Sequence, residues 1–195
     1  MATSDDRDDP APTPWGLVIL LGSLTAFAPM SIDMYLPSLP SIGQALHADA
    51  GQTQATVAAF LAGMAIGQFV YGPASDRVGR RAPILVGIAI YVVASVACAA
   101  SVSAPMLIAS RFVQALGGCA GAVVARAVVR DRFSHSETAR MLSLLTLVMG
   151  LAPILAPLLG GFLLTVGGWR ANFWTLAVFG LAVGAATFLR LPESR

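Results

Sequence analysis

The sequence predicts an all-α membrane protein, a bundle of six transmembrane helices in a chain of 195 residues. Two observations carry this prediction: apolar stretches fill nearly the whole chain, and arginines concentrate in alternate gaps between them. A helix needs about 20 apolar residues to cross a bilayer core, and only helices or closed barrels satisfy their own backbone groups there. The lengths of the stretches and their lack of strict alternation favour helices over barrel strands.

The predicted organisation is one transmembrane domain, residues 15–190, with two short ends. Residues 1–14 are polar and acidic, unlike the basic start of a signal peptide, and are expected to form a disordered cytoplasmic tail. Residues 191–195 are expected to form a cytoplasmic end. Short loops make sequential spans antiparallel neighbours, and residues 40–52 form the longest loop on the outer side. The expected spans are 15–39, 53–71, 82–101, 105–129, 141–166 and 171–189.

The composition excludes a soluble enzyme, because 56% hydrophobic and 11% charged residues leave too little polar surface. All twelve basic residues are arginine. Eight arginines lie after the second, fourth and sixth spans, whereas the opposite loops hold only Arg170. The positive-inside rule then predicts a multi-pass protein of the inner (plasma) membrane with both termini in the cytoplasm. A net charge of +2 distributed in this way sets topology and indicates no nucleic-acid partner.

Cysteines and histidines indicate neither a metal site nor a catalytic centre. Cys98 and Cys119 lie inside the third and fourth spans without CxxC spacing, as small packing residues do. His47 and His135 lie in loops on opposite sides of the membrane, so no cluster of catalytic groups forms within the spans. We therefore expect no enzymatic activity, no cofactor and no metal.

Small residues recur four apart inside the spans, as in Gly117 and Gly121. In lipid, such pairs let helix backbones approach closely, so we interpret them as packing positions. The other pairs are Gly63 with Gly67, and Gly180 with Gly184.

Two charges fall inside predicted spans, Asp33 in the first and Arg111 in the fourth. Each costs roughly 3 kcal/mol or more near the middle of a membrane helix, so neither is expected to face lipid. At 1.5 Å rise per residue, both lie about 9 Å to the outer side of their helix midpoints. An interaction between them, direct or across a water-filled cavity, is therefore possible. It is either a fixed structural ion pair or part of a solute and proton pathway, which Gln68 and Gln114 could also line. Tyr35 and Trp15 are interpreted as interfacial aromatics.

The cytoplasmic loop after the second span, residues 72–81, is dense in charges and turn formers. An ordinary positive-inside turn explains Arg77, Arg80 and Arg81, but not Asp76 and Gly79 at this spacing. A carboxylate at the N-terminal end of a helix can accept from free backbone N–H groups and is stabilised by the positive pole of the helix dipole. Asp131, at the cytoplasmic end of the fourth span, is a candidate partner for Arg80 or Arg77.

These motifs resemble the major facilitator superfamily and, within it, the bicyclomycin-resistance (Bcr/CflA) branch of drug exporters. Residues 72–81 match the signature between helices two and three, with Gly72, Asp76, Arg77, Gly79, Arg80 and Arg81 in register. Residues 111–117 are similar to the fourth-helix motif, whose arginine is implicated in proton coupling. Residues 32–40 are similar to the first helix of the Bcr/CflA branch, and Leu191–Pro192–Glu193–Ser194 to its ending after helix six.

The fifth span is similar to the antiporter motif at Ala156, Pro157, Gly160 and Gly161, which implies close helix packing. Ala156, Ser143 and Ala152 stand where that motif prefers glycine. The resemblance implies proton-driven export of small, drug-like molecules by alternating access, with Asp33 and Arg111 near the path and the Asp76 loop gating it. Phe27, Met30, Met34 and Phe60 would be adaptable apolar contacts for a drug.

The resemblance covers only the first half of a twelve-helix fold, and six helices cannot enclose its central cavity. Three interpretations stay open: a fragment of a longer product, a truncated gene product, or a half-size transporter that pairs with a second copy or another half. Alternative functions are dedicated transport of one metabolite, or a non-transporting membrane subunit. The partners expected are a drug-like solute, protons, the lipid bilayer and a C-terminal six-helix half.

Overall fold

The computed structural model describes residues 15–190, apart from the side chains of residues 135 and 136. The predicted tail at residues 1–14 and the predicted end at 191–195, with its Leu-Pro-Glu-Ser motif, lie outside the described residues. The described elements are α1 (Trp15–Asp33), a short 3-10 helix η1 (Leu36–Ser38), α2 (Leu39–Ala45), α3 (Ala50–Val78), α4 (Arg81–Ala99), α5 (Ala104–Arg132) and α6 (His135–Arg190).

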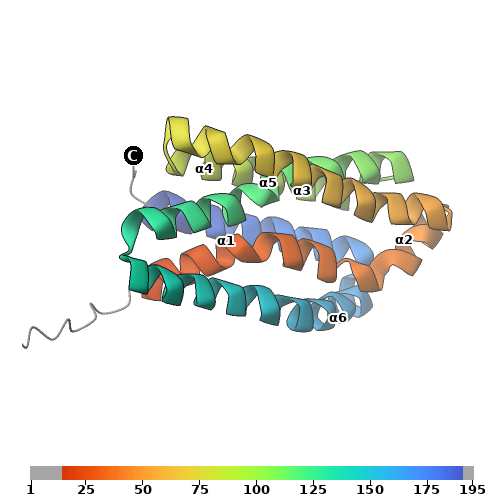
Figure 1. Cartoon of the computed structure of the whole chain (residues 1–195). Coiled ribbons are helices and arrows are strands. Elements are labelled where there is room, and N and C mark those ends of the chain that lie inside the picture. Colours follow the sequence, from red (N-terminus) through yellow and green to blue (C-terminus); the bar gives the residue numbers. More distant parts are fainter. Residues whose placement is uncertain (1–14, 191–195) are drawn as a thin grey trace, which may run out of the picture.

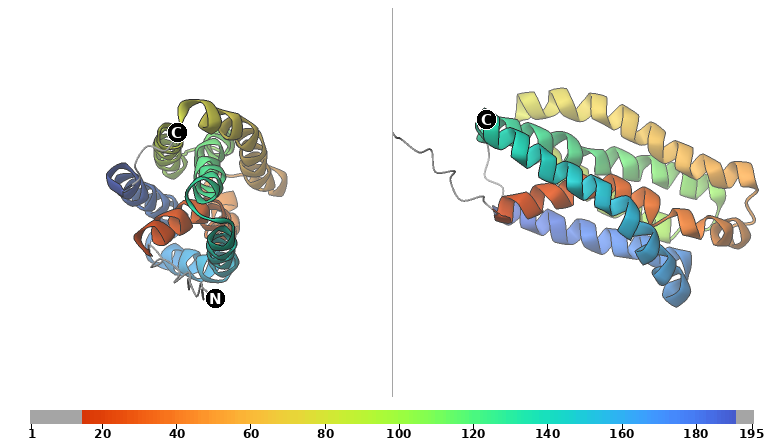
Figure 2. Two further views of the ribbon diagram at one scale, coloured as in Figure 1. Left: turned by 60° about the vertical axis from the view of Figure 1, so that its left-hand side comes forward. Right: turned by 60° about the horizontal axis from the view of Figure 1, so that its bottom comes forward.

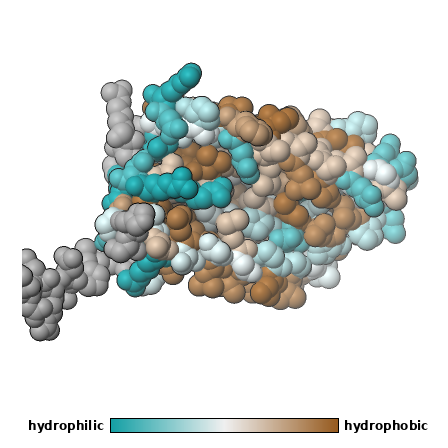
Figure 3. Space-filling model, in the orientation of Figure 1, coloured by the Kyte–Doolittle hydropathy of each residue, from teal (hydrophilic) through white to brown (hydrophobic). Residues whose placement is uncertain are grey.

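The long helices run back and forth along one axis, and the start of α1 and the end of α6 lie at the same end of the bundle (Figure 1). Hydrophilic residues gather at the two ends, with a hydrophobic band between them (Figure 3). Among the described residues, five helices are long and apolar enough to cross a membrane, the last of them covering 54 residues. The molecule therefore has the surface of a multi-pass membrane protein.

The last of these helices accounts for two spans. At 1.5 Å per residue, 54 residues extend about 80 Å, far more than a hydrocarbon core of about 30 Å. The helix breaks at Gly168, whose φ of 70° and ψ of −176° are accessible to glycine but strained for other residues. The chain turns back there, so α6 comprises an ascending arm, residues 135–167, and a descending arm, residues 169–190. The predicted bundle of six transmembrane helices is confirmed.

Two predicted loops are shorter than the sequence indicated. Residues 40–52 contain most of α2 and the start of α3, because Asp49 and Gln52 form a capping box with the Asp49 carboxylate accepting from Gln52 N–H at 2.7 Å. At the other end, α3 continues through Pro73 to Val78, so most of the predicted cytoplasmic loop is helical. The predicted span limits follow the apolar stretches, whereas the helices continue into the polar residues at their ends.

The centre of the bundle is α5, which packs against α1, α3 and α4, while α1 also packs against α6 (Figure 2). The predicted packing role of the glycine pairs is confirmed. Gly63 and Gly67 of α3 lie against the backbone of α5, Gly121 lies against the Leu24 carbonyl of α1, and Gly180 and Gly184 lie against side chains of α4. Close backbone contact replaces the hydrophobic driving force that lipid does not supply.

Two arginines bind the carbonyl ends of neighbouring helices. Arg170 donates from Nε to Ala99 O and from Nη2 to Ser101 O, each at 3.0 Å, where α4 ends. Arg81 donates to Phe188 O at 2.6 Å, near the end of α6. The last carbonyls of a helix have no partner within it, and a cation also favours the negative end of the helix dipole. These contacts tie α4 and α6 together at both ends.

We predict that Gly117→Ala destabilises the bundle by about 1–3 kcal/mol, because a methyl group there overpacks the α4–α5 contact. A Cβ at Gly117 would lie 2.5 Å from both Gly87 O and Tyr91 N, and these backbone atoms cannot rotate away. Thermal unfolding in mild detergent measures the effect. Gly150→Ala is the control, since nothing lies within 4 Å of a Cβ there. Equal melting temperatures for the two variants would contradict the prediction.

Candidate functional site

The guanidinium of Arg111, on α5, is fully buried inside the bundle. Three aromatic rings from other segments surround it, with Cζ to centroid distances of 4.2 Å for Phe60, 4.4 Å for Tyr35 and 5.8 Å for Phe173. A desolvated guanidinium on an aromatic face gains about 2 kcal/mol or more. We call Arg111 with these three rings the arginine cage. It joins α3, the segment after α1, and the descending arm of α6 around one charge.

A chain of hydrogen bonds holds the guanidinium from the α4 side. Arg111 Nη1 donates to Gln114 Oε1 at 2.7 Å, Gln114 Nε2 donates to Ser95 Oγ at 2.8 Å, and Ser95 Oγ donates to Tyr91 O at 2.7 Å. Gln114 and Ser95 are fully buried. The amide orientation is determined, because its oxygen must face a donor-only guanidinium. Gln114 therefore positions Arg111 rather than standing apart as a second binding group.

Two nitrogens of Arg111, Nε and Nη2, have no hydrogen-bond partner within the part of the chain that the structure describes. A buried donor without an acceptor costs free energy, more so when it is charged. In the described structure the buried positive charge of Arg111 therefore has N–H donors that are free to bind a further acceptor. Such a group can accept a carboxylate, a water molecule or a polar solute atom in another conformation of the protein.

The direct Asp33–Arg111 ion pair considered from the sequence is absent from the described residues, where Asp33 forms no ion pair. Asp33 is partly exposed and ends α1, and Tyr35, two residues later, occupies the face of the guanidinium instead. Gln68 does not join the site, because it is on the exposed face of α3 whereas Phe60 is on the buried face. Of the four predicted pathway residues, the fold brings Arg111 and Gln114 together.

The sequence-based interpretation of Tyr35 as an interfacial aromatic is wrong. Its side chain is 1% exposed, its hydroxyl hydrogen-bonds Thr56 Oγ1 at 2.5 Å, and its ring packs on Phe173 with centroids 5.6 Å apart. The position of an aromatic residue near the end of a span does not show whether its ring faces the bundle interior or the membrane interface. Sequence reasoning also missed Phe173, which no local pattern marks, and Asn172, which is the only asparagine of the chain and lies at the start of an apolar stretch.

A second cluster lies at the end of the bundle that holds the α3–α4 turn. Arg80 donates from Nη1 to Asp76 at 2.6 Å and to Ser75 Oγ at 2.8 Å, and from Nε to Asp131 at 2.8 Å. Of the two partners that the sequence offered for Asp131, Arg80 and Arg77, the structure shows Arg80. Hydrogen bonding to Asp131, and secondarily to Asp76, raises the pKa of Arg80. We call Arg80 with Ser75, Asp76 and Asp131 the Arg80 cluster, and it ties the end of α3 to the end of α5.

The turn that presents Arg80 depends on Gly79, whose φ of 96° lies outside the range of ordinary residues. Asp76 does not cap a helix N-terminus as the dipole argument expected; it lies in the last turns of α3, where Arg80 neutralises it. Arg77 is exposed on the same helix end, and Arg81 binds the end of α6. Gly72 borders an opening of about 350 Å3 between α3 and α5 that Arg80 also lines.

The predicted antiporter-type packing positions lie on the ascending arm of α6. Ala156 and Gly160 are buried on one face, and Gly160 lies directly against the backbone of Met34. Pro157 is half-buried and Gly161 is half-buried with nothing within 4 Å of a Cβ. Close packing at this motif is therefore concentrated at Gly160, where α6 meets the residue that follows α1.

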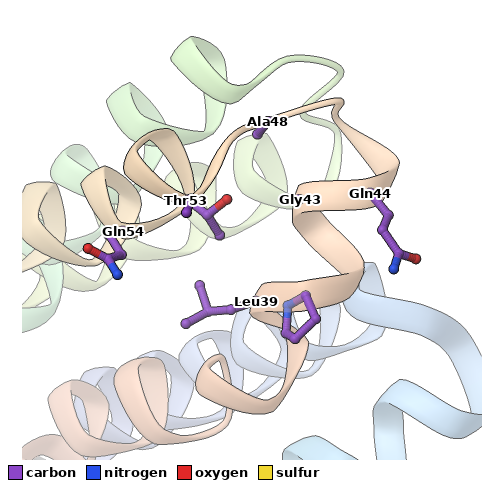
Figure 4. A pocket seen from close by; sticks show the side chains of 8 residues that line it. Leu39, Gly43, Gln44, Ala48, Thr53 and Gln54 are labelled. Carbon is purple, nitrogen blue, oxygen red and sulfur yellow. The ribbon is translucent and has the colours of Figure 1, made fainter.

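A hollow of about 390 Å3 lies at the opposite end of the bundle from Arg80, between α2 and the start of α3. Figure 4 shows Leu39 on one side of it and Thr53 and Gln54 on the other. Its lining residues carry amide, hydroxyl and apolar groups and no charge. The hollow is separate from the arginine cage, and none of the predicted pathway residues lines it.

Residues 21–195 match the sequence pattern of the Major Facilitator Superfamily. The chain belongs to this superfamily. An MFS-type transporter of Bacillus subtilis, YdgK, whose function is uncharacterised, is 41% identical over 180 residues, 91% of this chain and 45% of that protein. A bicyclomycin resistance protein homolog of Haemophilus influenzae is 36% identical over 177 residues, 91% of this chain and 44% of that protein.

Multidrug resistance protein MdtL of Shigella dysenteriae is also 36% identical, over 89% of this chain and 44% of that protein. The chain therefore spans less than half the length of these curated relatives and corresponds to the N-terminal half of the superfamily fold. The relatives named for drug and bicyclomycin resistance agree with the branch that the sequence motifs resemble. Membership also places the chain among transporter sequences rather than enzymes.

Solved structures show the same fold. The proton:xylose symporter XylE, bound to a brominated glucose, has a TM-score of 0.80 at 14% identity, over 92% of this chain and 45% of that one. A bacterial homolog of the human lysosomal transporter Spinster, in an inward-facing and unoccupied conformation, has a TM-score of 0.77 at 18% identity, over 94% of this chain and 44% of that one. At these identities the likeness concerns the fold alone.

We predict that Gln114→Leu lowers the stability of the bundle by about 1.5–3 kcal/mol, because Arg111 loses its one hydrogen-bond acceptor while staying buried. Thermal unfolding in detergent measures the loss. The control is Gln68→Leu, the same change at an exposed position of α3, which should leave the midpoint within error. A Gln114→Leu protein as stable as the control would show that the amide does not hold the guanidinium.

Proposed function

We propose that the chain forms the first half of a proton-coupled multidrug efflux transporter of the inner membrane, with both termini cytoplasmic. The observation that carries this proposal is the arginine cage: a fully buried cation with two unused donors, where three helices and the segment after α1 meet. A buried charge with a purely structural role is most stable when every one of its N–H donors has a hydrogen-bond acceptor. A charge with spare donors suits a site whose partners change during transport.

Asp33 supplies the complementary group in this proposal. It ends α1 two residues before Tyr35 and is partly exposed without a partner among the described residues. An ionised Asp33 attracts a proton or a cationic solute, and protonation removes that attraction. The proton and the cationic solute would therefore compete for Asp33, and the fixed charge of Arg111 would bias this competition. In an alternating-access cycle the competition would couple proton entry to solute release. Met30, half-buried, and the deeply buried Phe27, Met34 and Phe60 supply the apolar surroundings.

The second half of the fold is the partner that this proposal requires. The ascending arm of α6 buries little of its surface, and its exposed side chains include Leu147, Leu151, Ile154, Leu158 and Phe162. An apolar face of this length meets either lipid or another helix bundle. Because the relatives are about twice as long as this chain, we propose that a C-terminal six-helix half, or a second copy, covers part of this face.

The partial length also favours a second reading, an inactive fragment or a non-transporting membrane subunit. The two are separated by reconstituting this polypeptide alone in vesicles. Solute flux from the chain alone would exclude both an inactive fragment and a subunit. Competition by chemically unrelated solutes in cells that carry the complete gene product then separates a multidrug exporter from a dedicated metabolite transporter.

We predict that Asp33→Asn and Arg111→Ala, made in the gene product that carries this chain, each lower protonophore-sensitive drug export by about tenfold or more. Each change removes one of the two charges proposed to link the proton and the drug. Drug accumulation in cells with matched protein levels measures export. Asp49→Asn is the control, because asparagine caps the start of α3 as well as aspartate does. Normal export by both site variants would remove these residues from the mechanism.

We further propose that the Arg80 cluster gates the cytoplasmic side by holding the ends of α3 and α5 together. Arg80→Ala is predicted to reduce export by about tenfold, because Asp76 and Asp131 then repel each other in place of sharing a cation. Arg77→Ala removes the same charge from the same helix end, where Arg77 is exposed, and should keep most of the activity. If both variants lose export equally, general surface charge rather than this cluster is responsible.

A further inference from the structure

The first transmembrane segment changes its hydrogen-bond pattern just after α1. Tyr35 N donates to Ile32 O at 3.2 Å and Ser38 N donates to Tyr35 O at 2.9 Å, which are the three-residue steps of a tighter helix. Pro37 has no N–H to donate. The carbonyl of Met34 therefore receives neither the Ser38 N–H that an α-helix would supply nor a donor from Pro37. A buried carbonyl without a partner is costly in a membrane.

The side chain of Asn172, at the start of the descending arm of α6, supplies the missing donor. Its Nδ2 donates to Met34 O at 3.0 Å and to Ser38 Oγ at 2.8 Å, and the side chain is 1% exposed. A carbonyl can only accept, so the nitrogen must face Met34 and the amide orientation is determined. As a result Asn172 Oδ1 is buried without a hydrogen-bond partner among residues 15–190 as described. The amide thus gives up one of its own hydrogen bonds to hold this segment.

The two attachment points of Asn172 lie on either side of Tyr35 in the chain. Between them, the Tyr35 ring covers the Arg111 guanidinium at 4.4 Å and packs on Phe173, the neighbour of Asn172. The backbone of Met34 is also held from the ascending arm of α6 by Gly160. Both arms of α6 therefore fix the short backbone segment that carries one wall of the arginine cage.

We propose that Asn172 is a positioning residue: its amide replaces the helical hydrogen bond missing after α1 and so holds the Tyr35 ring against Arg111. Its effect on export rests on the transport function proposed above, whereas its effect on the segment does not. Asn172 acts through Tyr35 and needs no contact with a solute. The alternative is that Asn172 only joins α1 to α6, as polar side chains in membrane helices commonly do.

The first test reads the segment itself and does not depend on transport. In the gene product that carries this chain, Asn172→Leu should speed amide hydrogen exchange in the peptide covering residues 34–46 by about tenfold or more, because the buried hydrogen bonds to Met34 O and Ser38 Oγ are both lost. Gln68→Leu, an amide-to-leucine change at an exposed position, should leave this peptide unchanged. Unchanged exchange in Asn172→Leu would overturn the proposal.

The second test is a double-mutant cycle of export rates at matched protein levels. If Asn172 acts through Tyr35, Asn172→Leu lowers export, and adding it to Tyr35→Leu lowers export no further. If the fold-loss of export in the double variant equals the product of the two single fold-losses, Asn172 acts independently of Tyr35 and only joins α1 to α6. That result would overturn the proposal. A wild-type protein without proton-driven export would reject the transport function, while the exchange measurement would still decide the role of Asn172.

A third variant covers failure of Asn172→Leu to fold. Pro37→Ala removes the proline ring and restores an N–H, so that α1 can continue and Ser38 N–H can reach Met34 O. Pro37→Ala with Asn172→Leu should therefore recover the folded yield and keep exchange at residues 34–46 as slow as in Pro37→Ala alone, because Ser38 N–H then satisfies Met34 O. A yield that stays low would overturn the proposal. Recovery of full export together with yield would contradict a positioning role, because the tighter turn held by Asn172 would then be dispensable.

Discussion

A guanidinium without access to water, in a chain surrounded by hydrocarbon, requires its neighbours to supply compensating groups. Arg111 obtains aromatic faces from Tyr35, Phe60 and Phe173 and an acceptor from Gln114, which α4 holds through Ser95. The helices α3, α4 and α5, the descending arm of α6 and the segment after α1 thus all contribute to one charge. Since moving any of these helices alone would expose or strip that charge, the cage restricts how the bundle can rearrange.

The interruptions of the helices are governed by the same requirement, that protein groups must satisfy buried polar groups. Where the backbone leaves the α-helical pattern, side chains from distant helices take over its hydrogen bonds: Asn172 serves the carbonyl of Met34, Arg170 the end of α4, and Arg81 the end of α6. Irregular backbone is tolerated in a membrane only when protein groups satisfy it. The breaks are therefore also points where side-chain hydrogen bonds connect one helix to another.

The arginine cage and the Arg80 cluster are connected by the same two helices. Phe60 and Asp76 lie on α3, Arg111 and Asp131 lie on α5, and Gly63 and Gly67 bring the two backbones into contact between them. Because α3 and α5 are joined at two depths, a change at one cluster reaches the other through rigid packing.

The sequence by itself determined the membrane environment, the number of spans and the glycine packing, and it limited the partner of Asp131 to Arg80 or Arg77, because hydropathy, residue spacing and charge are local properties of a chain. It did not determine which groups surround Arg111. Tyr35, Phe173 and Asn172 come from segments far apart in sequence, and whether Tyr35 faces lipid or the interior depends on how the chain turns after Asp33. Only tertiary packing decided that an aromatic ring, and not the Asp33 carboxylate, covers the buried guanidinium, because the tightened turn held by Asn172 directs the ring inward.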